Sequence, residues 1–344
     1  MKKDNLKFKY RGGIHIHSKN SDGTGDVDTI TKAAKKAGLS WIIVTDHDNF
    51  DIDEGIFNDV YLIKGEEISP QKENHYLAIG INEKINSTSN PQIYINKVRE
   101  QNGIGFAAHP DEQNERNNNY PPIRWNKLFI PDGVEIWNWF STWGDNFNSK
   151  NIFRLIYSFL FKHNLVSQAS PKTLAWWDEL NSNSNNIIPA IGGIDAHALK
   201  IKDYILPVTV FSYDSMFKTI NNIIYLNEEL SKDFQTAKQQ IFIAIKNANN
   251  LIVNKYISEN IPTIKVTNKT QCAYIGETIK LDAETFLNIE TSQKSIIKII
   301  LNGQELYKIF AKKCELLLTK IGKYRIEIFV KGRAFAYSNP IVVI

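Results

Sequence analysis

Short apolar runs alternate with segments of helical spacing over about the first 200 residues of the chain. The apolar runs predict strands at residues 13–16, 41–45, 60–63, 76–81, 104–107, 133–137, 187–191 and 205–211. Apolar residues at helical spacing predict helices at residues 29–37, 93–101, 152–163 and 171–181. Such alternation is typical of a parallel α/β fold, whose sheet is either open or closed into a barrel.

The pattern changes after this region. Two more helices are predicted at residues 215–227 and 233–247, and short strands follow at residues 261–266, 278–281, 295–301, 304–310, 322–330 and 340–344. Asn302 and Gly303 separate two of these strands, and both tolerate positive φ, which predicts a tight hairpin. We therefore expect two domains, an α/β domain of residues 1–256 and a small antiparallel β-sandwich of residues 257–344.

The composition is ordinary for a globular protein, and it excludes several classes of function. The 344 residues include 41 Lys and Arg against 37 Asp and Glu, a net charge of +4, without the basic run typical of nucleic-acid binding. Two cysteines are too few for a disulfide-rich scaffold, a four-thiolate zinc site or an iron–sulfur cluster. The sequence shows neither the apolar core of a signal peptide nor the roughly 18 apolar residues of a membrane span. We expect a soluble, cytoplasmic protein, although a leader removed during maturation would leave no trace.

Six of the seven histidines lie at the ends of predicted strands. His15 and His17 stand two apart at the end of the first strand, so both side chains are expected on one face. The other four are His47, His75, His109 and His197. Five of the six follow the C-terminal end of a strand, and these ends gather at one mouth in a parallel α/β fold. We therefore expect the imidazoles to converge.

Carboxylates occur at matching places. Asp22 lies in a Ser-Asp-Gly turn, Glu66 and Glu67 end the third strand, and Asp195 ends a late strand. Imidazole and carboxylate ligands without thiolates suit Zn, Mn or Fe and argue against Mg or Ca alone. Six histidines with three or four carboxylates exceed what one metal needs. The set therefore predicts two or three divalent metal ions.

The order of these residues resembles that of the PHP (polymerase and histidinol phosphatase) superfamily. The motifs are His15-x-His17, Asp22, Thr45-Asp46-His47, Gly65-x-Glu67, His75, His109-Pro110 and Asp195-x-His197. The resemblance covers roughly residues 10–255 and implies a distorted (β/α)7 barrel with a di- or trinuclear metal centre at its C-terminal mouth. Residues 132–138, 322–328 and 337–341 resemble the branch of PHP metallohydrolases akin to carbaryl hydrolase.

The resemblance also implies a role for each ligand. One ion would be held by His15, His17, Glu67 and Asp195. Glu67 would bridge to a second ion held by His75 and His109, and a third would be held by Asp22, His47 and His197. The residues expected to be catalytic are Glu67, Asp195 and His197, around a hydroxide that bridges the ions. Metal ions lower the pKa of such a water and neutralise charge on substrate oxygens.

Several neighbouring residues have more than one interpretation. Glu66 competes with Glu67, because adjacent strand residues face opposite ways, and the family spacing favours Glu67. Asp46 either orients a ligand histidine or caps its loop. Glu135 is expected to support the site or to hydrogen-bond inside the barrel, and not to bind metal. His163 is interpreted as a cationic cap at the end of its helix.

Other side chains near the mouth are candidates for substrate contacts. An aromatic rim for the leaving group, or simple packing, is the interpretation of Tyr120, Trp137, Trp139 and Trp143. The candidates for holding a phosphate, with solvated loop charges as the alternative, are Arg116, Arg124 and Lys200. Cys272 and Cys314 either form a disulfide or stay buried free thiols.

Hydrolysis of a small phosphoester, a phosphomonoester or nucleotide, is the leading prediction, because several cations share the anionic oxygens of an in-line displacement. The alternative is a metal-dependent carboxylester, carbamate or amide hydrolase, and a third hypothesis is a non-enzymatic binding protein that uses the β-domain. We expect a phosphorylated small molecule as the partner, and neither long nucleic acid nor a membrane. The natural substrate, the physiological metal, the role of the β-domain and the oligomeric state are not defined by the sequence.

Overall fold

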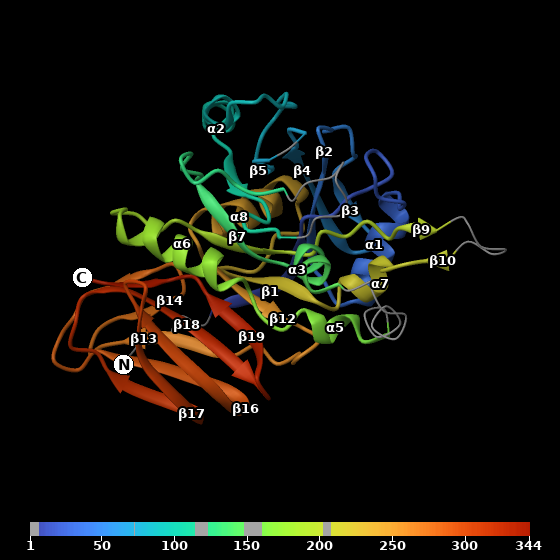
Figure 1. The fold of residues 1–344 in the computed structure, drawn as a ribbon. Helices are drawn as coiled ribbons and strands as arrows, with labels where there is room; N and C mark the ends of the chain where they lie inside the picture. The colour runs from blue at the N-terminus through green and yellow to red at the C-terminus, as the bar shows by residue number, and fades with distance from the viewer. Residues whose placement is uncertain (1–6, 72, 114–122, 148–159, 202–207) are drawn as a thin grey trace. The chain divides into compact units, whose positions relative to one another are not determined.

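The computed structural model describes residues 7–71, 73–113, 123–147, 160–201 and 208–344 (Figure 1). The chain divides into two compact units that are interleaved along the sequence. One unit comprises Arg11–Thr173 and Ala190–Asn221, and the other comprises Met1–Tyr10, Leu174–Pro189 and Asn222–Ile344. The protein is therefore a mixed α/β protein with C-terminal antiparallel strands, while a domain boundary at residue 256 stays a prediction.

A seven-strand order organises the unit that contains the histidines. The strands are β1 (Phe8–Ile14), β2 (Trp41–His47), β4 (Val60–Ile68), β5 (Tyr76–Ile79), β6 (Ile104–Ala107), β7 (Gly133–Asn138) and β8 (Ala190–Gly193). Each pairs with the next, and the pairs β1–β2, β2–β4, β6–β7 and β7–β8 are parallel. The expectation of an all-parallel sheet is wrong at β5, which runs antiparallel to both neighbours. The connection from β4 to β5, residues 69–75, is too short for a parallel crossover, which needs about a dozen residues or more.

Hydrogen bonds also join the end of β8 to the end of β1. The Ile194 N–H donates to the Ile14 carbonyl at 3.0 Å, and the His17 N–H donates to the Ala196 carbonyl at 2.9 Å. Ile16 and Ala196 form a parallel bridge. The first and last strands of the order thus meet at the ends that carry the histidines.

Helices and short strands complete the connections. The helices are α1 (Val27–Lys36), α2 (Pro91–Glu100), α3 (Trp139–Asn146), α5 (Lys162–Leu165), α6 (Pro171–Ser182), α7 (Tyr213–Met216) and α8 (Phe234–Lys246), and the short strands are β3 (Gly55–Phe57), β9 (Lys200–Ile201) and β10 (Val208–Thr209). Asp26, Asn90 and Asp233 each accept a backbone N–H as the N-cap of a helix. The predicted helix 152–163 lies largely outside the described residues, as do residues 205–207 of the predicted strand 205–211.

The predicted helix at residues 215–227 is wrong. The chain forms only the short α7 there and then β11 (Ile220–Leu226), in which all seven residues are buried. A strand that is covered on both faces loses the alternation of apolar and polar residues, so its spacing can imitate that of a helix. The β-branched residues Ile220, Ile223 and Ile224 favour the strand.

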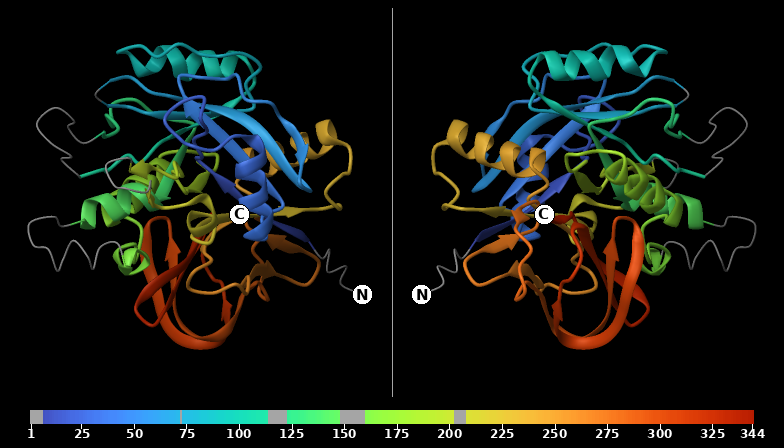
Figure 2. Two further views of the ribbon diagram at one scale, coloured as in Figure 1. Left: turned by 90° about the vertical axis from the view of Figure 1, so that its right-hand side faces the viewer. Right: turned by 90° about the vertical axis from the view of Figure 1, so that its left-hand side faces the viewer.

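The C-terminal strands pair mostly antiparallel. They are β12 (Asn250–Asn254), β13 (Thr263–Thr267), β14 (Cys272–Tyr274), β15 (Thr278–Ile279), β16 (Phe286–Leu301), β17 (Gln304–Leu317), β18 (Gly322–Val330), β19 (Arg333–Ser338) and β20 (Ile341–Val343). Only β15–β20 is parallel among the printed ladders of this part of the described chain. The hairpin at Asn302 and Gly303 is confirmed, with φ of 49° and 82° between β16 and β17. This long hairpin bends, and its register shifts twice (Figure 2).

A buried ion group fastens α6 to these strands. Arg325 on β18 donates through Nε and Nη2 to both carboxylate oxygens of Asp178, each at 2.6 Å, and through Nη1 to Glu327 at 2.7 Å. The guanidinium also lies 5.5 Å from the centre of the Trp177 ring. Around these strands the core consists mainly of isoleucine, valine and leucine side chains, together with several aromatic ones. Buried charges of this kind are stable only when every partner is present.

Two smaller features complete the description. Cys272 and Cys314 do not form a disulfide, so the thiol interpretation holds, although both side chains are half-buried rather than buried. Among the described residues, no helix is long and apolar enough to cross a membrane.

Candidate metal centre

All nine residues predicted as ligands come together in one unit. Four groups have one potential ligand atom per residue within 4.8 Å of the others. The groups are His17–Asp22–His47–His197, His15–Glu67–His109, His15–His17–Asp195 and His47–Glu67–His75. Shared members link the groups, so they form one continuous cluster. Their roles as metal ligands stay predictions.

The strand order explains why these residues meet. His15 and His17 follow β1, His47 ends β2, and Glu67 lies near the end of β4. His109 follows β6, while Asp195 and His197 follow β8. His75 precedes its strand, and it reaches the same mouth because β5 is reversed.

Glu67 lies at the centre of the cluster. One of its carboxylate oxygens, Oε1, is 2.8 Å from His75 Nδ1 and 3.3 Å from His109 Nε2. The other, Oε2, is 3.0 Å from His47 Nδ1, 3.3 Å from His15 Nε2 and 3.4 Å from His17 Nε2. One fully buried carboxylate therefore faces five imidazoles, which is the geometry needed for a bridging ligand.

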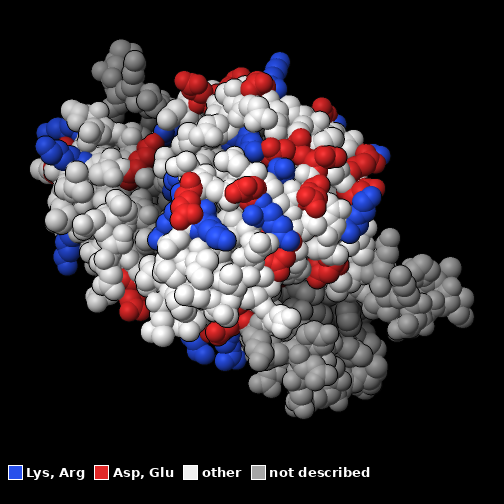
Figure 3. Space-filling view, turned by 90° about the horizontal axis from the view of Figure 1, so that it is seen from above, with Lys and Arg blue, Asp and Glu red and all other residues white. Residues whose placement is uncertain are grey.

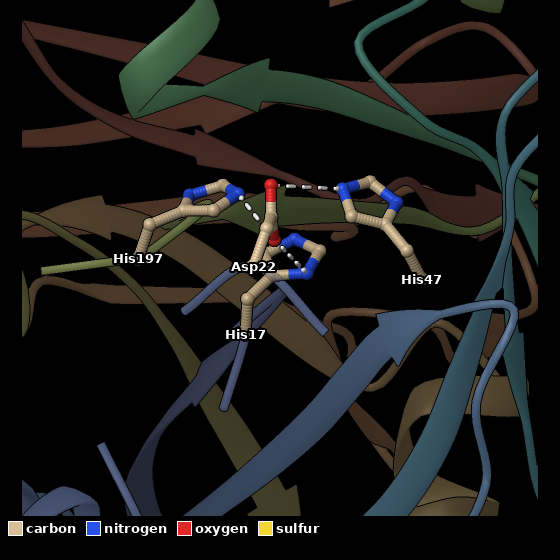
Figure 4. Close-up of side chains that lie close together, drawn as sticks. All are labelled: His17, Asp22, His47 and His197. Atoms are coloured by element: carbon tan, nitrogen blue, oxygen red, sulfur yellow. Dashed lines mark ion pairs between the residues drawn. The ribbon is translucent and has the colours of Figure 1, made fainter. Parts of the chain in front are cut away.

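Asp22 occupies the solvent-facing side of the cluster. Its carboxylate lies between three imidazole rings (Figure 4), 3.2 Å from His197 Nε2 and 3.7 Å from both His17 Nδ1 and His47 Nε2. The Asp22 side chain is 56% exposed and that of His47 is 29% exposed, whereas that of His17 is fully buried. Solvent therefore reaches the cluster from the side of Asp22.

Mutual electrostatics shift the pKa values of these groups strongly. Burial raises the pKa of the Glu67 carboxyl, but His47, His15 and His75 outweigh it and hold that pKa well below its usual range. Burial likewise opposes protonation of His47, yet Glu67 raises the pKa of His47 to about 9. The charges of the cluster are thus set by each other rather than by solvent.

The pKa of His17 shifts in the opposite direction to that of His47. Burial, together with His197 and His47, lowers the pKa of His17 to about 3, so its imidazole is neutral at physiological pH. Neither ring nitrogen has a hydrogen-bond partner among the described residues, although the ring is fully buried. Three other buried atoms of the cluster also lack a hydrogen-bond partner among the described residues: His15 Nε2, His109 Nδ1 and Glu67 Oε2. Buried polar atoms are normally satisfied, so these donor atoms fit divalent metal ions.

Three of the predicted ligands have a strained backbone conformation. His15, His109 and Asp195 have positive φ values of 65°, 27° and 57°. The His15 carbonyl accepts the N–H groups of both Asp195 and Ala196, at 2.7 and 3.2 Å. Conformations of this kind cost free energy and persist where the surroundings enforce them, often at functional sites.

Glu135 contacts two residues of the cluster, His15 and His109, which confirms the prediction that it supports the site. Its Oε1 is 2.7 Å from His15 Nδ1, and its Oε2 accepts the His109 backbone N–H at 2.7 Å. The Asn138 amide donates to Glu135 at 3.1 Å and to Asp195 at 3.3 Å. Because Glu135 occupies Nδ1 of His15, the unpartnered Nε2 is left to face Glu67.

A glycine makes room for this support. A Cβ atom at Gly193 would lie 1.6 Å from Glu135 Oε1, so Gly193→Ala must displace the carboxylate from His15 and His109. We expect metal affinity to fall by about 10- to 100-fold, the usual cost of losing a partner of a ligand. Titration calorimetry with Mn²⁺ on the metal-free variant measures this, and thermal unfolding controls for its folding. Unchanged affinity would show that Glu135 does not position His15.

Glu66 faces away from the cluster, as the spacing predicted. It accepts the Ile85 N–H at 2.8 Å, and its Oε1 has no hydrogen-bond partner among the described residues. Burial raises the pKa of the Glu66 carboxyl to about 7. Glu66 is thus a buried structural carboxyl beside a carboxylate of the cluster.

The raised pKa of Glu66 predicts a loss of stability with rising pH. Its stabilising contribution is complete below the unfolded value of 4.5 and is lost as the pH rises through the folded value of about 7. Glu66→Gln imitates the protonated acid, so from about pH 5 to about pH 8 it should gain on the order of 2 kcal/mol over wild type. Urea unfolding of both metal-free proteins tests this, and parallel pH profiles would contradict it.

The structure favours the loop-cap interpretation of Asp46. Asp46 accepts hydrogen bonds from the backbone N–H and hydroxyl of Ser18 and from the hydroxyl of Ser21, all at 2.6 Å. Tyr213, which the sequence did not indicate, donates to the His17 carbonyl at 2.6 Å and accepts the Gly25 N–H at 3.1 Å. Together they hold the loop that carries Asp22.

The predicted substrate contacts have different outcomes. Trp137, Trp139 and Trp143 are buried, which fits packing rather than a rim. Arg124 donates from Nε to the Glu112 carbonyl at 2.8 Å. His163 lies in α5 beside Trp139, with ring centres 5.7 Å apart, and its role as a helix cap stays a prediction. Outside the described residues or side chains lie Arg116, Tyr120 and Lys200.

Comparison with known proteins gives limited matches in sequence. No protein-family model matches the chain. An uncharacterized protein of Methanocaldococcus jannaschii is 28% identical over 151 residues, covering 37% of this chain and 81% of that protein.

Comparison with solved structures gives matches of wider coverage. A two-domain protein from Bacteroides vulgatus containing a predicted PHP-like metal-dependent phosphoesterase matches 99% of this chain and 97% of its own, with 13% identity and a TM-score of 0.48. PsfC from Pseudomonas syringae matches 69% of this chain and 89% of its own, with 11% identity and a TM-score of 0.41. A Bifidobacterium adolescentis protein, proposed to be a metal-dependent phosphoesterase, matches 59% of this chain and 93% of its own, with 16% identity and a TM-score of 0.32.

Proposed function

We propose that this protein is a metal-dependent hydrolase of small phosphoesters. One observation carries the proposal: six histidines and three carboxylates converge, and they include the neutral, fully buried His17 with both ring nitrogens unpartnered among the described residues. Packing alone gives no reason to bury such a ring without partners. Divalent metal ions satisfy these atoms and suit imidazole and carboxylate donors.

The donor set suits two or three ions of Zn, Mn or Fe. His15, His17, Glu67 and Asp195 would hold one ion, Glu67 with His75 and His109 a second, and Asp22, His47 and His197 a third. Bound there, the ions supply positive charge to the phosphoryl oxygens and lower the pKa of water.

The residues of the chain then have distinct tasks. Glu67 holds neighbouring ions together, while Glu135 keeps His15 in the tautomer that presents Nε2. Asn138 ties Glu135 to Asp195, so the two sides of the cluster keep their spacing. Tyr213 and Asp46 hold the loop of Asp22 at the solvent side, where substrate enters.

A sheet closed into a barrel would bring all of these residues to one opening. We infer a distorted barrel of the (β/α)7 type, followed by a β-sandwich. The hydrogen bonds from Ile194 and His17 across the ends of β8 and β1 support closure. Strand ends that surround one opening explain how ligands from residues 15 to 197 share a cluster.

Surface charge is consistent with a small substrate. The face seen in Figure 3 carries basic and acidic side chains interspersed, in keeping with the net charge of +4. Long nucleic acids bind through grouped cations. One observation favours the alternative of a neutral ester or carbamate: among the described residues, no lysine or arginine forms an ion pair with the nine cluster residues.

Turnover by the Mn-reconstituted protein tests the reaction class. The panel holds an aryl phosphomonoester, an aryl phosphodiester, a nucleoside bisphosphate and an aryl carbamate, with His17→Ala as the blank. We expect phosphoester turnover that disappears in His17→Ala together with metal binding. Turnover of the carbamate alone would replace this proposal with the alternative.

A further inference from the structure

An aromatic ring lies directly beside the solvent-facing part of the cluster. Phe140, in the first turn of α3, has its ring centre 5.5 Å from that of His197, with the planes tilted by 40°. Phe140 is half-buried, whereas its neighbours Trp139 and Trp143 are almost completely buried. Of these three rings, Phe140 is therefore the one that both contacts a cluster histidine and remains accessible.

The position of Phe140 is rigidly defined. The Asn138 side chain caps α3 by accepting the Ser141 N–H at 2.8 Å, while its amide binds Glu135 and Asp195. Behind Phe140, the Phe211 ring packs edge-on at 5.9 Å, with a backbone φ of 56°. A bulky residue with positive φ is strained, so the surroundings must enforce its place. Asn138 thus connects the helix that carries Phe140 to two residues of the site, Glu135 and Asp195.

We propose that Phe140 is a specificity residue, which selects phosphoesters whose alcohol part carries a flat aromatic ring. This inference rests on the proposed function. Phosphoryl oxygens at the cluster leave the ester group pointing toward the accessible side, where Asp22 and His197 lie. Aromatic rings interact favourably at centre separations of 4.5–7 Å, so a ring attached there has Phe140 as its stacking surface.

The reaction itself needs no additional reagent. The oxygen of water forms a bond to phosphorus, and the bond between phosphorus and the ester oxygen breaks. The ester oxygen leaves with its electron pair and takes a proton from water, which gives the aromatic alcohol and inorganic phosphate. Phe140 acts only on the affinity for the aromatic part.

Two substrates of similar size and similar leaving group, one with a flat aromatic ring and one with a saturated ring, test this. Benzyl phosphate and cyclohexylmethyl phosphate differ in the aromaticity of the ring, so the ratio of their kcat/KM values reports stacking. Phe140→Leu keeps an apolar side chain and should lower this ratio by roughly three- to tenfold, mainly through the benzyl ester. Phe147→Leu is the matched control, because Phe147 is a second phenylalanine of the same aromatic group and packs on Trp143 at 4.8 Å. Its ratio should stay within about twofold of wild type.

Binding gives a second readout that needs no turnover. Calorimetry of the Mn-loaded protein with benzylphosphonate and cyclohexylmethylphosphonate should show the same loss of preference in Phe140→Leu. Equal changes for both compounds, or an equal effect of Phe147→Leu, would overturn the assignment of Phe140 while leaving the phosphoesterase proposal intact. Wild-type protein that neither cleaves the esters nor binds the phosphonates would overturn the proposed function, and this inference with it.

Discussion

Glu67→Gln should abolish turnover and strip the protein of metal. The two carboxylate oxygens of Glu67 lie 2.8 to 3.4 Å from five imidazoles, so this residue has more partners in the cluster than any other described ligand. The neutral amide offers one acceptor instead of two and places an NH₂ group among imidazole donors. Since loss of even an outer partner costs 10- to 100-fold in metal affinity, we expect at least about a 100-fold loss here. Mass spectrometry of bound metal and the phosphoester assay measure the two effects.

Glu66→Gln provides the matched control on the neighbouring residue. Glu66 accepts the Ile85 N–H on the other face of β4, and glutamine preserves that hydrogen bond. Its metal content and turnover should therefore equal those of wild type at pH 7. If both variants lost metal equally, the effect of Glu67→Gln would reflect general damage to β4, and the central place of Glu67 would be wrong.

Arg325→Met should cause the largest loss of stability. Methionine fills the space of the arginine stem but leaves the Asp178 and Glu327 carboxylates without the charge that both contact. Removal of one member of a buried ion group costs about 3–5 kcal/mol. For a unit of this size the melting temperature should fall by roughly 10 °C. Scanning calorimetry and urea unfolding measure the change.

An exposed ion pair of the same unit is the control. Lys313 and Glu290 lie 3.0 Å apart, but their side chains are 71% and 51% exposed. Lys313→Met should cost less than about 1 kcal/mol, because solvent screens such pairs. A comparable loss in both variants would mean that burial of the Arg325 group contributes nothing to its effect.

Much of the sheet could be predicted because its strands are short apolar runs. The runs at 41–45, 60–63, 104–107 and 133–137 all lie within observed strands. The direction of β5 depends on the length of one connection, which apolar patterning does not report. The strand β11 imitates a helix because both of its faces are buried. Tertiary context, rather than local preference, decides these two elements.

The candidate site could be predicted further than the fold. Histidines and carboxylates at strand ends are visible in the sequence, and all nine predicted residues meet. The residues that position these ligands could not be predicted from the sequence. Gly193, for example, is needed because it leaves space for the Glu135 side chain, which is 58 positions away in the chain. The same applies to Phe140, whose proximity to His197 arises from the packing of α3. Residues with intrinsic metal chemistry can be found by type, whereas residues that act through neighbours need coordinates.

The interleaving of the two units has a consequence for synthesis on the ribosome. Seven of the nine cluster residues precede residue 110, whereas Asp195 and His197 follow the segment Leu174–Pro189, which belongs to the other unit. The nascent chain therefore exposes seven of its nine predicted metal ligands before the last two, Asp195 and His197, are synthesised. During that interval the emerging segment has several imidazoles open to any metal ion in the cell.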